Sequence, residues 1–297
     1  MTTLSRRSFG VVSGLLADLV LGEPKVEPHP VSAFGTAMRN VEHAVYRDRR
    51  TAGVAYTAVG VGIGVAAGAL VRSTGAATYL SVAHRALVVA AQEVADALER
   101  NDLEAARARL PALVGRDPSH LGPEEIARAV VESLAENTVD AVVAPSVWAL
   151  LAGAAGTLGY RAANTMDATV GYKNTRYANF GWASARLDDL ANFVPARLTA
   201  LLVVLVRPTT ASAVWRAVRR DAPNHPSPNA GVAEAAFAAA LGLQLGGANT
   251  YGTRTECRAA LGSGRRPKAD DIATAIALCR DVTYALVGVM GLVGVLS

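Results

Sequence analysis

The chain has 297 residues, of which 51% are hydrophobic and only 18% are charged, and its formal net charge is +4. Soluble domains usually carry about 25% charged residues, so this composition argues against a soluble domain and indicates a membrane protein. The positive charge is spread along the chain without a basic run and interleaved aromatic residues, which argues against a nucleic-acid-binding protein.

The N-terminal segment combines two adjacent arginines, Arg6 and Arg7, with the apolar stretch 9–21. This pattern resembles a twin-arginine export signal. However, the stretch contains Asp18 and ends without a small-x-small cleavage pattern, so we interpret it as an uncleaved first membrane segment. The Pro-rich stretch after it, which contains His29, cannot form a regular helix.

The clearest membrane span predicted from the sequence is 54–71, which contains no charged residue. Its glycines recur as Gly60-x-x-x-Gly64-x-x-x-Gly68, a stripe of small residues suited to close contact with another helix. Three further apolar stretches are predicted to be membrane segments: 139–160, 190–206 and 282–296. The first of these contains Pro145 and several glycines, so it either spans or forms a broken or re-entrant element. The apolar stretch 230–247 is another candidate for a re-entrant element, and a basic loop follows it.

Residues 78–138 are interpreted as an extramembrane helical arm. Apolar residues recur at helical spacing from Thr78 to Arg109, and charged residues fill the opposite face. A turn follows, and Pro123 then begins another helix with two acidic residues in its first turn. These patterns predict an all-α fold, in which one membrane-embedded domain, 1–297, consists of polytopic helices, this arm and Pro-rich active-site loops.

Polar side chains form three short stripes beside the apolar sequence in the middle of the chain. Residues three or four positions apart share one face of a helix. The stripes consist of Glu132, Glu136 and Asp140 with Asn137 beside them; Arg161, Asn164 and Asp167; and Asp188 and Asn192 with Arg186 and Asp189 alongside. An acidic pair on a helix is usually a solvated face, but polar groups close to hydrocarbon are costly and tend to mark function. We therefore interpret the three stripes as parts of one active site.

The residue types in the stripes favour phosphate and metal chemistry. No phosphate-binding loop, dinucleotide-binding fingerprint, nucleophile elbow or zinc-protease motif is present in the sequence. Carboxylates and amides are hard oxygen ligands that suit Mg²⁺, and arginine and lysine suit phosphate groups. This inventory predicts metal-assisted phosphoryl or acyl-phosphate chemistry, in which positioning and charge stabilisation provide most of the catalysis.

A set of short blocks, in a fixed order along nearly the whole chain, resembles one known family. The blocks are Asp18-x-x-x-Gly22-Glu23-Pro24, His29-Pro30-Val31, Gly115-Arg116-Asp117, Glu132-Ser133-x-x-Glu136-Asn137-x-x-Asp140, Tyr160-Arg161-Ala162-x-Asn164-Thr165-x-Asp167, Gly171-Tyr172-Lys173, Phe180-Gly181, Ala185-Arg186-Leu187-Asp188-Asp189-x-x-Asn192, Pro195-Ala196-Arg197-Leu198-Thr199 and His225-Pro226-Ser227-Pro228-Asn229-Ala230-Gly231-x-x-Glu234. On these blocks the chain resembles the adenosylcobinamide-phosphate synthase (cobinamide synthase) family of cobalamin biosynthesis. It departs from the family at Glu23, where Asp is common, and at Ala141, where Gly is usual.

The resemblance implies a multi-pass enzyme of the cell membrane with its active face in the cytoplasm. Members of the family are ligases that form an amide bond between a propionate carboxylate of (adenosyl)cobyric acid and aminopropanol or aminopropanol phosphate, and they consume ATP. The expected partners are therefore the corrinoid substrate, the amine and the lipid bilayer, and no nucleic acid. Association with other corrinoid-pathway enzymes and formation of a homo-oligomer are both left open.

The resemblance also suggests roles for individual residues. The acidic set that includes the Mg²⁺ ligands is Glu132, Glu136, Asp140, Asp188 and Asp189, with the metal placed on the last four. The expected binders of ATP phosphates or of an anionic amine are Arg161, Lys173, Arg186 and Arg197. Further substrate or ATP contacts are expected from Asn137, Asn164, Asp167, Asn192, Asn229 and Glu234. The residue that accepts the proton of the attacking amine would be His29 or His225, since imidazole titrates near neutral pH.

Two other classes of protein remain as alternatives. Intramembrane charges and helices broken by glycine or proline are also features of transporters, so the chain would alternatively transport a corrinoid or another anionic small molecule. A third interpretation is a membrane scaffold that uses the helical arm to dock other corrinoid enzymes. Amide formation by the isolated protein without a membrane gradient distinguishes the ligase from both.

Overall fold

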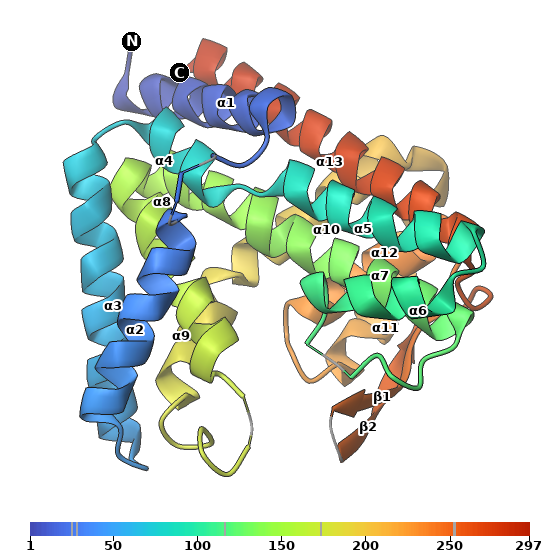
Figure 1. Ribbon diagram of the computed structural model, residues 1–297. Coiled ribbons are helices and arrows are strands. Elements are labelled where there is room, and N and C mark those ends of the chain that lie inside the picture. The colour runs from blue at the N-terminus through green and yellow to red at the C-terminus, as the bar shows by residue number, and fades with distance from the viewer. Residues whose placement is uncertain (25, 28, 116, 173, 252–253) are drawn as a thin grey trace. The chain divides into compact units, whose positions relative to one another are not determined.

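The computed structural model of the chain describes residues 1–24, 26–27, 29–115, 117–172, 174–251 and 254–297 (Figure 1). The chain divides into two compact units. Unit 1 consists of Met1–Ala83, Asp140–Phe193 and Val287–Ser297, and unit 2 consists of His84–Val139 and Val194–Leu286. The single membrane-embedded domain, 1–297, stays a prediction, and each unit is described by itself.

Unit 1 is built from helices, whose ends follow local sequence signals. Thr2 caps the first helix, because its side chain accepts a hydrogen bond from the Ser5 amide at 3.0 Å. Pro30 occupies the first turn of the second helix, as expected for a residue without an amide hydrogen. The helices of the unit are α1 (Thr3–Leu21), α2 (Pro30–Val45), α3 (Arg50–Val71), α4 (Thr74–Ser81), α8 (Ala144–Val170) and α9 (Trp182–Ala191).

Helix α3 packs closely on α8 through the predicted glycine stripe (Figure 1). A Cβ atom added at Gly64 would lie 2.5 Å from the Leu158 carbonyl oxygen, and one at Gly68 would lie 2.3 Å from the Ala154 carbonyl oxygen. Real Cβ atoms essentially never approach other atoms so closely, so only glycine fits at these positions. The prediction of a small-residue helix contact is therefore confirmed.

The stretch 139–160 contains two breaks from regular α-helix. A π-helical turn occupies Val139–Val143, and Gly153 lies inside α8 with a φ of 64° and a ψ of −150°. Only glycine adopts this backbone conformation easily. The Arg7 guanidinium donates to the Leu151 carbonyl oxygen beside the break. The helix is thus irregular at these two places, and whether the stretch spans the membrane or is re-entrant stays a prediction.

Unit 2 contains α5 (His84–Glu99), α6 (Leu103–Arg109), α7 (Pro123–Thr138), α10 (Phe193–Val206), α11 (Ala211–Arg220), α12 (Ala230–Leu241) and the first part of α13 (Ala269–Leu296). Helix α7 forms the core of the unit, because nearly every residue from Ile126 to Ala135 is buried. The predicted arm, 78–138, therefore includes a core helix, and its place outside the membrane stays a prediction.

A β-hairpin lies where the sequence suggested only a basic loop. Strands β1 (Leu245–Tyr251) and β2 (Arg254–Leu261) pair antiparallel, with an irregularity between Leu245 and Gly247. Helix α12 ends just before the hairpin, because Gly242 adopts a φ of 67°. The apolar stretch 230–247 is thus one helix followed by the start of a strand. Its prediction as a re-entrant element is not tested by this arrangement.

The described helices include several that are long and apolar enough to span a membrane. Three helices meet this requirement by themselves: Arg50–Val71, Pro123–Val170 and Ala269–Leu296. A fourth span is added if the bent pair Trp182–Ala191 and Phe193–Val206, with an angle of 40° between its helices, crosses as one. Helix α1, which contains the predicted segment 9–21, is not among them. The all-α, polytopic membrane fold predicted from the sequence is confirmed.

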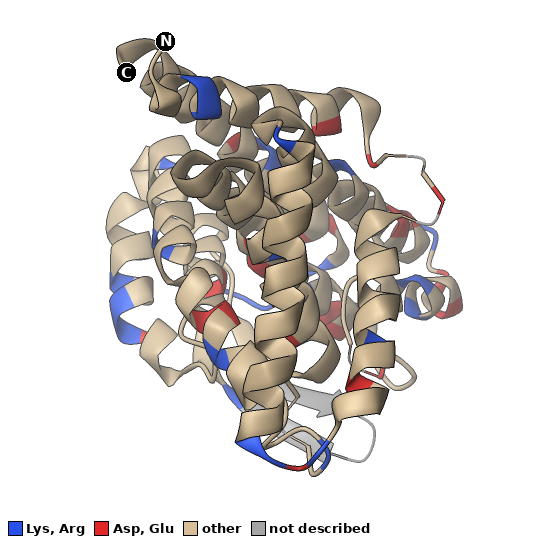
Figure 2. Cartoon of the chain, turned by 90° about the vertical axis from the view of Figure 1, so that its left-hand side faces the viewer, with Lys and Arg blue, Asp and Glu red and all other residues tan. Residues whose placement is uncertain are grey.

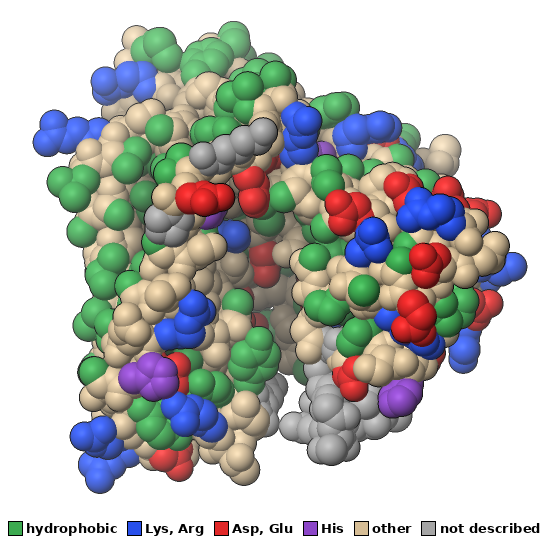
Figure 3. All heavy atoms as spheres, viewed as in Figure 1, with side chains coloured by type: hydrophobic (Ala, Val, Ile, Leu, Met, Phe, Trp, Pro, Cys, Tyr) green, Lys and Arg blue, Asp and Glu red, His purple; other side chains and the backbone are tan. Residues whose placement is uncertain are grey.

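Helix α3 has the surface expected of a lipid-facing helix. No charged residue lies between Arg50 and Arg72 (Figure 2). Its exposed apolar side chains include Val54, Ile63 and Leu70, the last of which is 81% exposed. Figure 3 shows such apolar side chains along the left edge of the molecule, where α3 lies in Figure 1. Exposure of this kind suits contact with hydrocarbon.

Candidate functional site

Each unit contains a polar cluster that is buried in part. The aspartate cluster of unit 1 consists of Asp140, Tyr160, Asn164, Asp188 and Asn192. The glutamate–histidine cluster of unit 2 consists of Glu136, His225, Glu234 and Arg258. An arginine pocket, defined below, also belongs to unit 2.

Asn164 lies at the centre of the aspartate cluster and bridges two carboxylates. Its Nδ2 donates to Asp140 Oδ2 and to Asp188 Oδ1, in both cases at 3.2 Å. Asn192 Nδ2 donates to the second oxygen of Asp188 at 3.0 Å, and the Tyr160 hydroxyl lies 2.9 Å from Asn192 Oδ1. Because carboxylates only accept hydrogen bonds, the side-chain amides of Asn164 and Asn192 act as donors to the two aspartates.

The remaining predicted residues of unit 1 lie around this cluster. Arg161 Nη1 donates to Asn164 Oδ1 at 3.3 Å, and the same side chain lines a small, mainly apolar cavity of about 120 Å³. Asp167 lies within electrostatic range of Asp188 and Asp189. Arg186 is exposed and pairs with Asp189 at 3.8 Å, which is a weak surface ion pair.

Two further residues of unit 1, His29 and Lys173, were predicted from the sequence as site residues. His29 is half-buried at the start of α2, and its Nε2 has no hydrogen-bond partner among the described residues. Lys173, predicted to bind phosphate, lies outside the described residues.

The glutamate–histidine cluster joins residues from separate elements of unit 2. Glu136 lies on α7, His225 follows a short 3₁₀ turn, and Glu234 lies on α12. One side-chain ligand atom from each lies within 4.8 Å of the others. His225 Nε2 is 3.5 Å from Glu234 Oε1, and Arg258 Nη1 is 3.3 Å from the same nitrogen.

Burial dominates the electrostatics of this cluster. Glu234 is 0% exposed, and burial raises the pKa of its carboxyl well above the usual range, with further increases caused by Glu136 and Glu132. Burial also lowers the pKa of His225 below its ordinary value. Both shifts disfavour the charged forms of these side chains.

Several residues around this cluster hold nearby backbone or side chains in place. Glu132 Oε1 accepts a hydrogen bond from the Gly246 amide at 2.9 Å, and Arg128 donates to the Gly246 carbonyl oxygen. Arg197 donates to Asn229 Oδ1 at 2.9 Å, just before the first residue of α12. Asn137 folds back on its own helix, where its amide donates to the Ser133 carbonyl oxygen at 3.0 Å.

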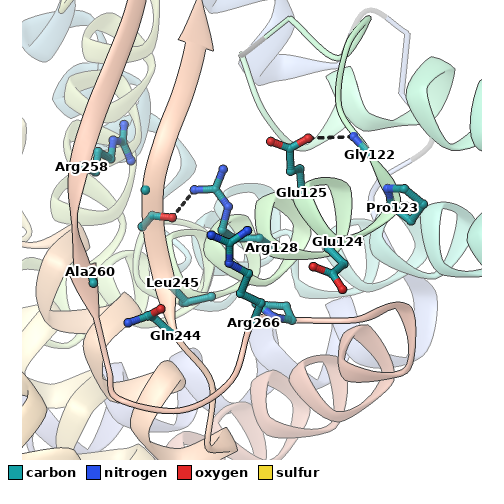
Figure 4. Close-up of a pocket in the computed structure, with 13 residues that line it drawn as sticks. Gly122, Pro123, Glu124, Glu125, Arg128, Gln244, Leu245, Arg258, Ala260 and Arg266 are labelled. Carbon is teal, nitrogen blue, oxygen red and sulfur yellow. Dashed lines mark hydrogen bonds between the residues drawn. The ribbon is translucent and has the colours of Figure 1, made fainter.

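The arginine pocket is a cavity of about 550 Å³ between the start of α7 and the β-hairpin. Its cationic lining consists of Arg128, Arg258 and Arg266, and the acidic residues at its edge are Glu124 and Glu125. Figure 4 shows Arg128 bonded to backbone at the hairpin and Glu125 bonded to the amide of Gly122. Arginine side chains around a cavity of this size suit a phosphate-bearing ligand.

Sequence reasoning did not select three residues that the structure places at these sites. Tyr160 was part of the motif blocks without a role, although it is adjacent to Arg161. Arg128 lies four residues before Glu132, a spacing that predicts an i,i+4 pair, and the two side chains approach to 3.5 Å. Arg258 lies on a strand that the sequence pattern did not reveal, so no local signal predicted its position.

These features define an α-helical, multi-pass membrane protein with buried carboxylate clusters. The chain belongs to the CobD/Cbib protein family, whose model matches residues 11–279. The resemblance read from the sequence motifs is thereby confirmed. No solved structure matches the chain.

Curated relatives from several bacteria support the family. The chain is 46% identical to the cobalamin biosynthesis protein CobD of Mycobacterium tuberculosis (strain CDC 1551 / Oshkosh), over 95% of this chain and 94% of the relative. It is 42% identical to CobD of Geobacter metallireducens, over 86% of this chain and 87% of the relative. It is 40% identical to the cobalamin biosynthesis protein CbiB of Salmonella arizonae, over 88% of this chain and 89% of the relative.

Proposed function

We propose that the chain acts in cobalamin biosynthesis as an ATP-dependent acid–amine ligase. It would join a propionate carboxylate of (adenosyl)cobyric acid to aminopropanol or aminopropanol phosphate. The names of the relatives support the pathway, and the arginine pocket is the observation that carries the reaction type, because it suits a polyphosphate co-substrate. The active face would be cytoplasmic, since ATP is available there.

The reaction needs activation of a carboxylate that does not react with amines by itself. In the first step, a carboxylate oxygen of the corrinoid would bond to the γ-phosphorus of ATP, and the bond from that phosphorus to ADP would break. In the second step, the amine nitrogen would attack the acyl carbon, and inorganic phosphate would leave. The amine proton would pass to a protein base. Positioning and charge stabilisation would provide most of the rate enhancement.

The arginine pocket would hold the phosphates. Arg128 is fixed by its bonds to the hairpin backbone, so its guanidinium needs little reordering when a ligand binds. Arg266 is more exposed and would meet the outer phosphates. Arg161 and Arg197 remain predicted contacts of ATP phosphates or of an anionic amine.

The predicted Mg²⁺ would bring charge neutralisation to the nucleotide phosphates. Carboxylate oxygens of the aspartate cluster fit the preference of this ion for oxygen ligands. The residues of unit 1 that would hold it are Asp140, Asp188 and Asp189. Glu136, the fourth ligand predicted from the sequence, belongs to unit 2 and lies in the glutamate–histidine cluster. Asn164 supports this role by fixing the first two carboxylates relative to each other. His29 and His225 remain the two candidates for the base.

The decisive experiment supplies detergent-solubilised protein with adenosylcobyric acid, Mg²⁺-ATP and either amine, and follows the corrinoid product by mass. We expect an amide product that requires ATP.

Arg266→Gln should raise the KM for ATP about tenfold, whereas the exposed Arg216→Gln on α11 serves as the matched control and should leave the KM unchanged. Absence of product with both amines, in protein that still binds the corrinoid, would favour the transporter alternative, which uptake into proteoliposomes then tests.

A further inference from the structure

We propose that unit 2 binds one divalent transition-metal ion between Glu136, His225 and Glu234. This site differs from the Mg²⁺ set predicted from the sequence, which combined Glu136 with three aspartates. It lies wholly within unit 2 and goes beyond the proposed ligase, so its test does not require the ligase reaction.

The spacing of the three side chains fits a single ion. Their ligand atoms lie within 4.8 Å of one another. Ligand atoms about 2.1 Å from a tetrahedral metal lie about 3.4 Å apart, as follows from the usual Zn–N and Zn–O distances. The separation of His225 Nε2 and Glu234 Oε1 is 3.5 Å, so this pair already has the required distance.

A second observation points independently to a cation at this place. The Glu234 side chain is completely buried, yet neither of its carboxylate oxygens accepts a hydrogen bond among the residues that the structure describes. A buried carboxylate without hydrogen-bond donors is costly. Glu136 adds a second carboxylate close by. A divalent cation would compensate both charges at once.

The imidazole of His225 is held as a metal ligand would be. His225 Nδ1 lies 3.1 Å from the Ser227 carbonyl oxygen. In the tautomer that carries the proton on Nδ1, this nitrogen donates to that oxygen, and the lone pair of Nε2 faces Glu234. Histidine ligands of metals usually have their second ring nitrogen fixed by a neighbouring group in this way. One imidazole with two carboxylates suits Zn²⁺, Mn²⁺, Fe²⁺ or Co²⁺ better than Mg²⁺, which prefers an all-oxygen environment.

Arg258 is the competing counter-ion. Its Nη1 lies 4.0 Å from Glu234 Oε1 and 3.3 Å from His225 Nε2. The same side chain lines the arginine pocket, so it can turn toward that pocket when a metal binds. A single guanidinium compensates one negative charge, whereas the cluster contains two carboxylates. With a metal on its Nε2, His225 would not serve as the base of the ligase, and His29 would be the remaining candidate.

The test uses full-length protein purified in detergent through an affinity tag without histidines. The metal content is measured by mass spectrometry of the elements, and the metal-free protein is then titrated with Co²⁺, whose visible absorption reports ligand geometry. We expect one Co²⁺ per chain at micromolar concentration. His225→Ala and Glu234→Gln should each lower the affinity at least tenfold, while the exposed His120→Ala should bind as the wild type does.

Two outcomes would overturn the proposal. One is wild-type protein that binds no Co²⁺, Zn²⁺ or Mn²⁺ at one ion per chain up to 100-fold excess. The other is binding that both variants retain unchanged, since the ion would then sit elsewhere. If Glu234→Gln does not fold, Glu136→Gln takes its place, and the spectrum of the wild type alone still decides whether an imidazole and oxygen site exists. Because these measurements involve no ATP or corrinoid, their failure would leave the ligase proposal standing.

Discussion

The contact of α3 with α8 gives a prediction that can be worked out from the geometry. In Gly64→Ala the new methyl group would lie 2.5 Å from the Leu158 carbonyl oxygen and 2.8 Å from Ala162 Cβ. The two helices would have to separate, and overpacking of this kind typically costs about 1–3 kcal/mol. Gly62→Ala on the same helix is the matched control, because a Cβ there meets nothing within 4 Å.

The comparison of these two variants isolates the cost of the close contact. Both gain the same helix propensity on replacing glycine by alanine, at most about 1 kcal/mol, so this contribution cancels. We therefore expect Gly64→Ala to be less stable than Gly62→Ala by about 1–3 kcal/mol. The assay is denaturant unfolding in mixed micelles, followed through Trp148 and Trp182, both of which belong to unit 1. Equal unfolding midpoints for the two variants would refute the idea that the glycine stripe sets the distance between the helices.

Three further predictions follow from buried polar contacts. Burial lowers the pKa of His84 from 6.5 to about 4, so the unfolded chain binds the proton at a higher pH than the folded chain does. The free energy of unfolding should therefore fall by at most about 3 kcal/mol as the pH drops from 6.5 to 4. Unfolding midpoints at pH 8 and pH 5 check this, and a loss that persists in His84→Leu would contradict it. Asn164→Leu removes both amide bonds that fix the aspartate cluster, and product formation should fall about 10–100-fold with the fold intact by circular dichroism. Asp221→Ala removes the acceptor of the hydrogen bond from the Gly262 amide, which is 2.9 Å long. The free energy of unfolding, measured by thermal unfolding, should fall by about 1.5–3 kcal/mol. Unchanged stability would show that this hydrogen bond contributes nothing.

Local sequence patterns predicted much of the helical framework. The glycine spacing of four in 54–71 predicted a helix contact surface, and the Pro–Gly content of 139–160 offered a broken element as one alternative, which agrees with the breaks at Val139–Val143 and Gly153. Both signals act within a few residues, so they are visible without the rest of the chain. The hairpin at 245–261 had no comparable signal, because its glycines and threonines suit a loop as well as a strand.

The polar clusters show the limit of such reasoning more sharply. Glu234 lies in an apolar stretch and His225 lies in a Pro-rich loop, so neither belongs to a stripe with Glu136. Their convergence depends on the packing of α7 against α12, which is a long-range contact. The resemblance to the family supplied these residues as candidates, whereas spacing alone would have left them out. Their arrangement around a common point could come only from the fold.

The acidic stripe of Glu132, Glu136 and Asp140 illustrates why spacing did not predict roles. On a regular helix, residues four apart share one face, and one common site follows. In the structure, Asp140 lies in a π-helical turn, where each turn contains more residues and the faces drift apart. Glu132 binds the hairpin backbone, Glu136 joins the glutamate–histidine cluster, and Asp140 accepts from an amide in unit 1. One stripe in the sequence thus supplies three environments, and substitution of each acid should affect a different property: hairpin stability, metal binding and product formation.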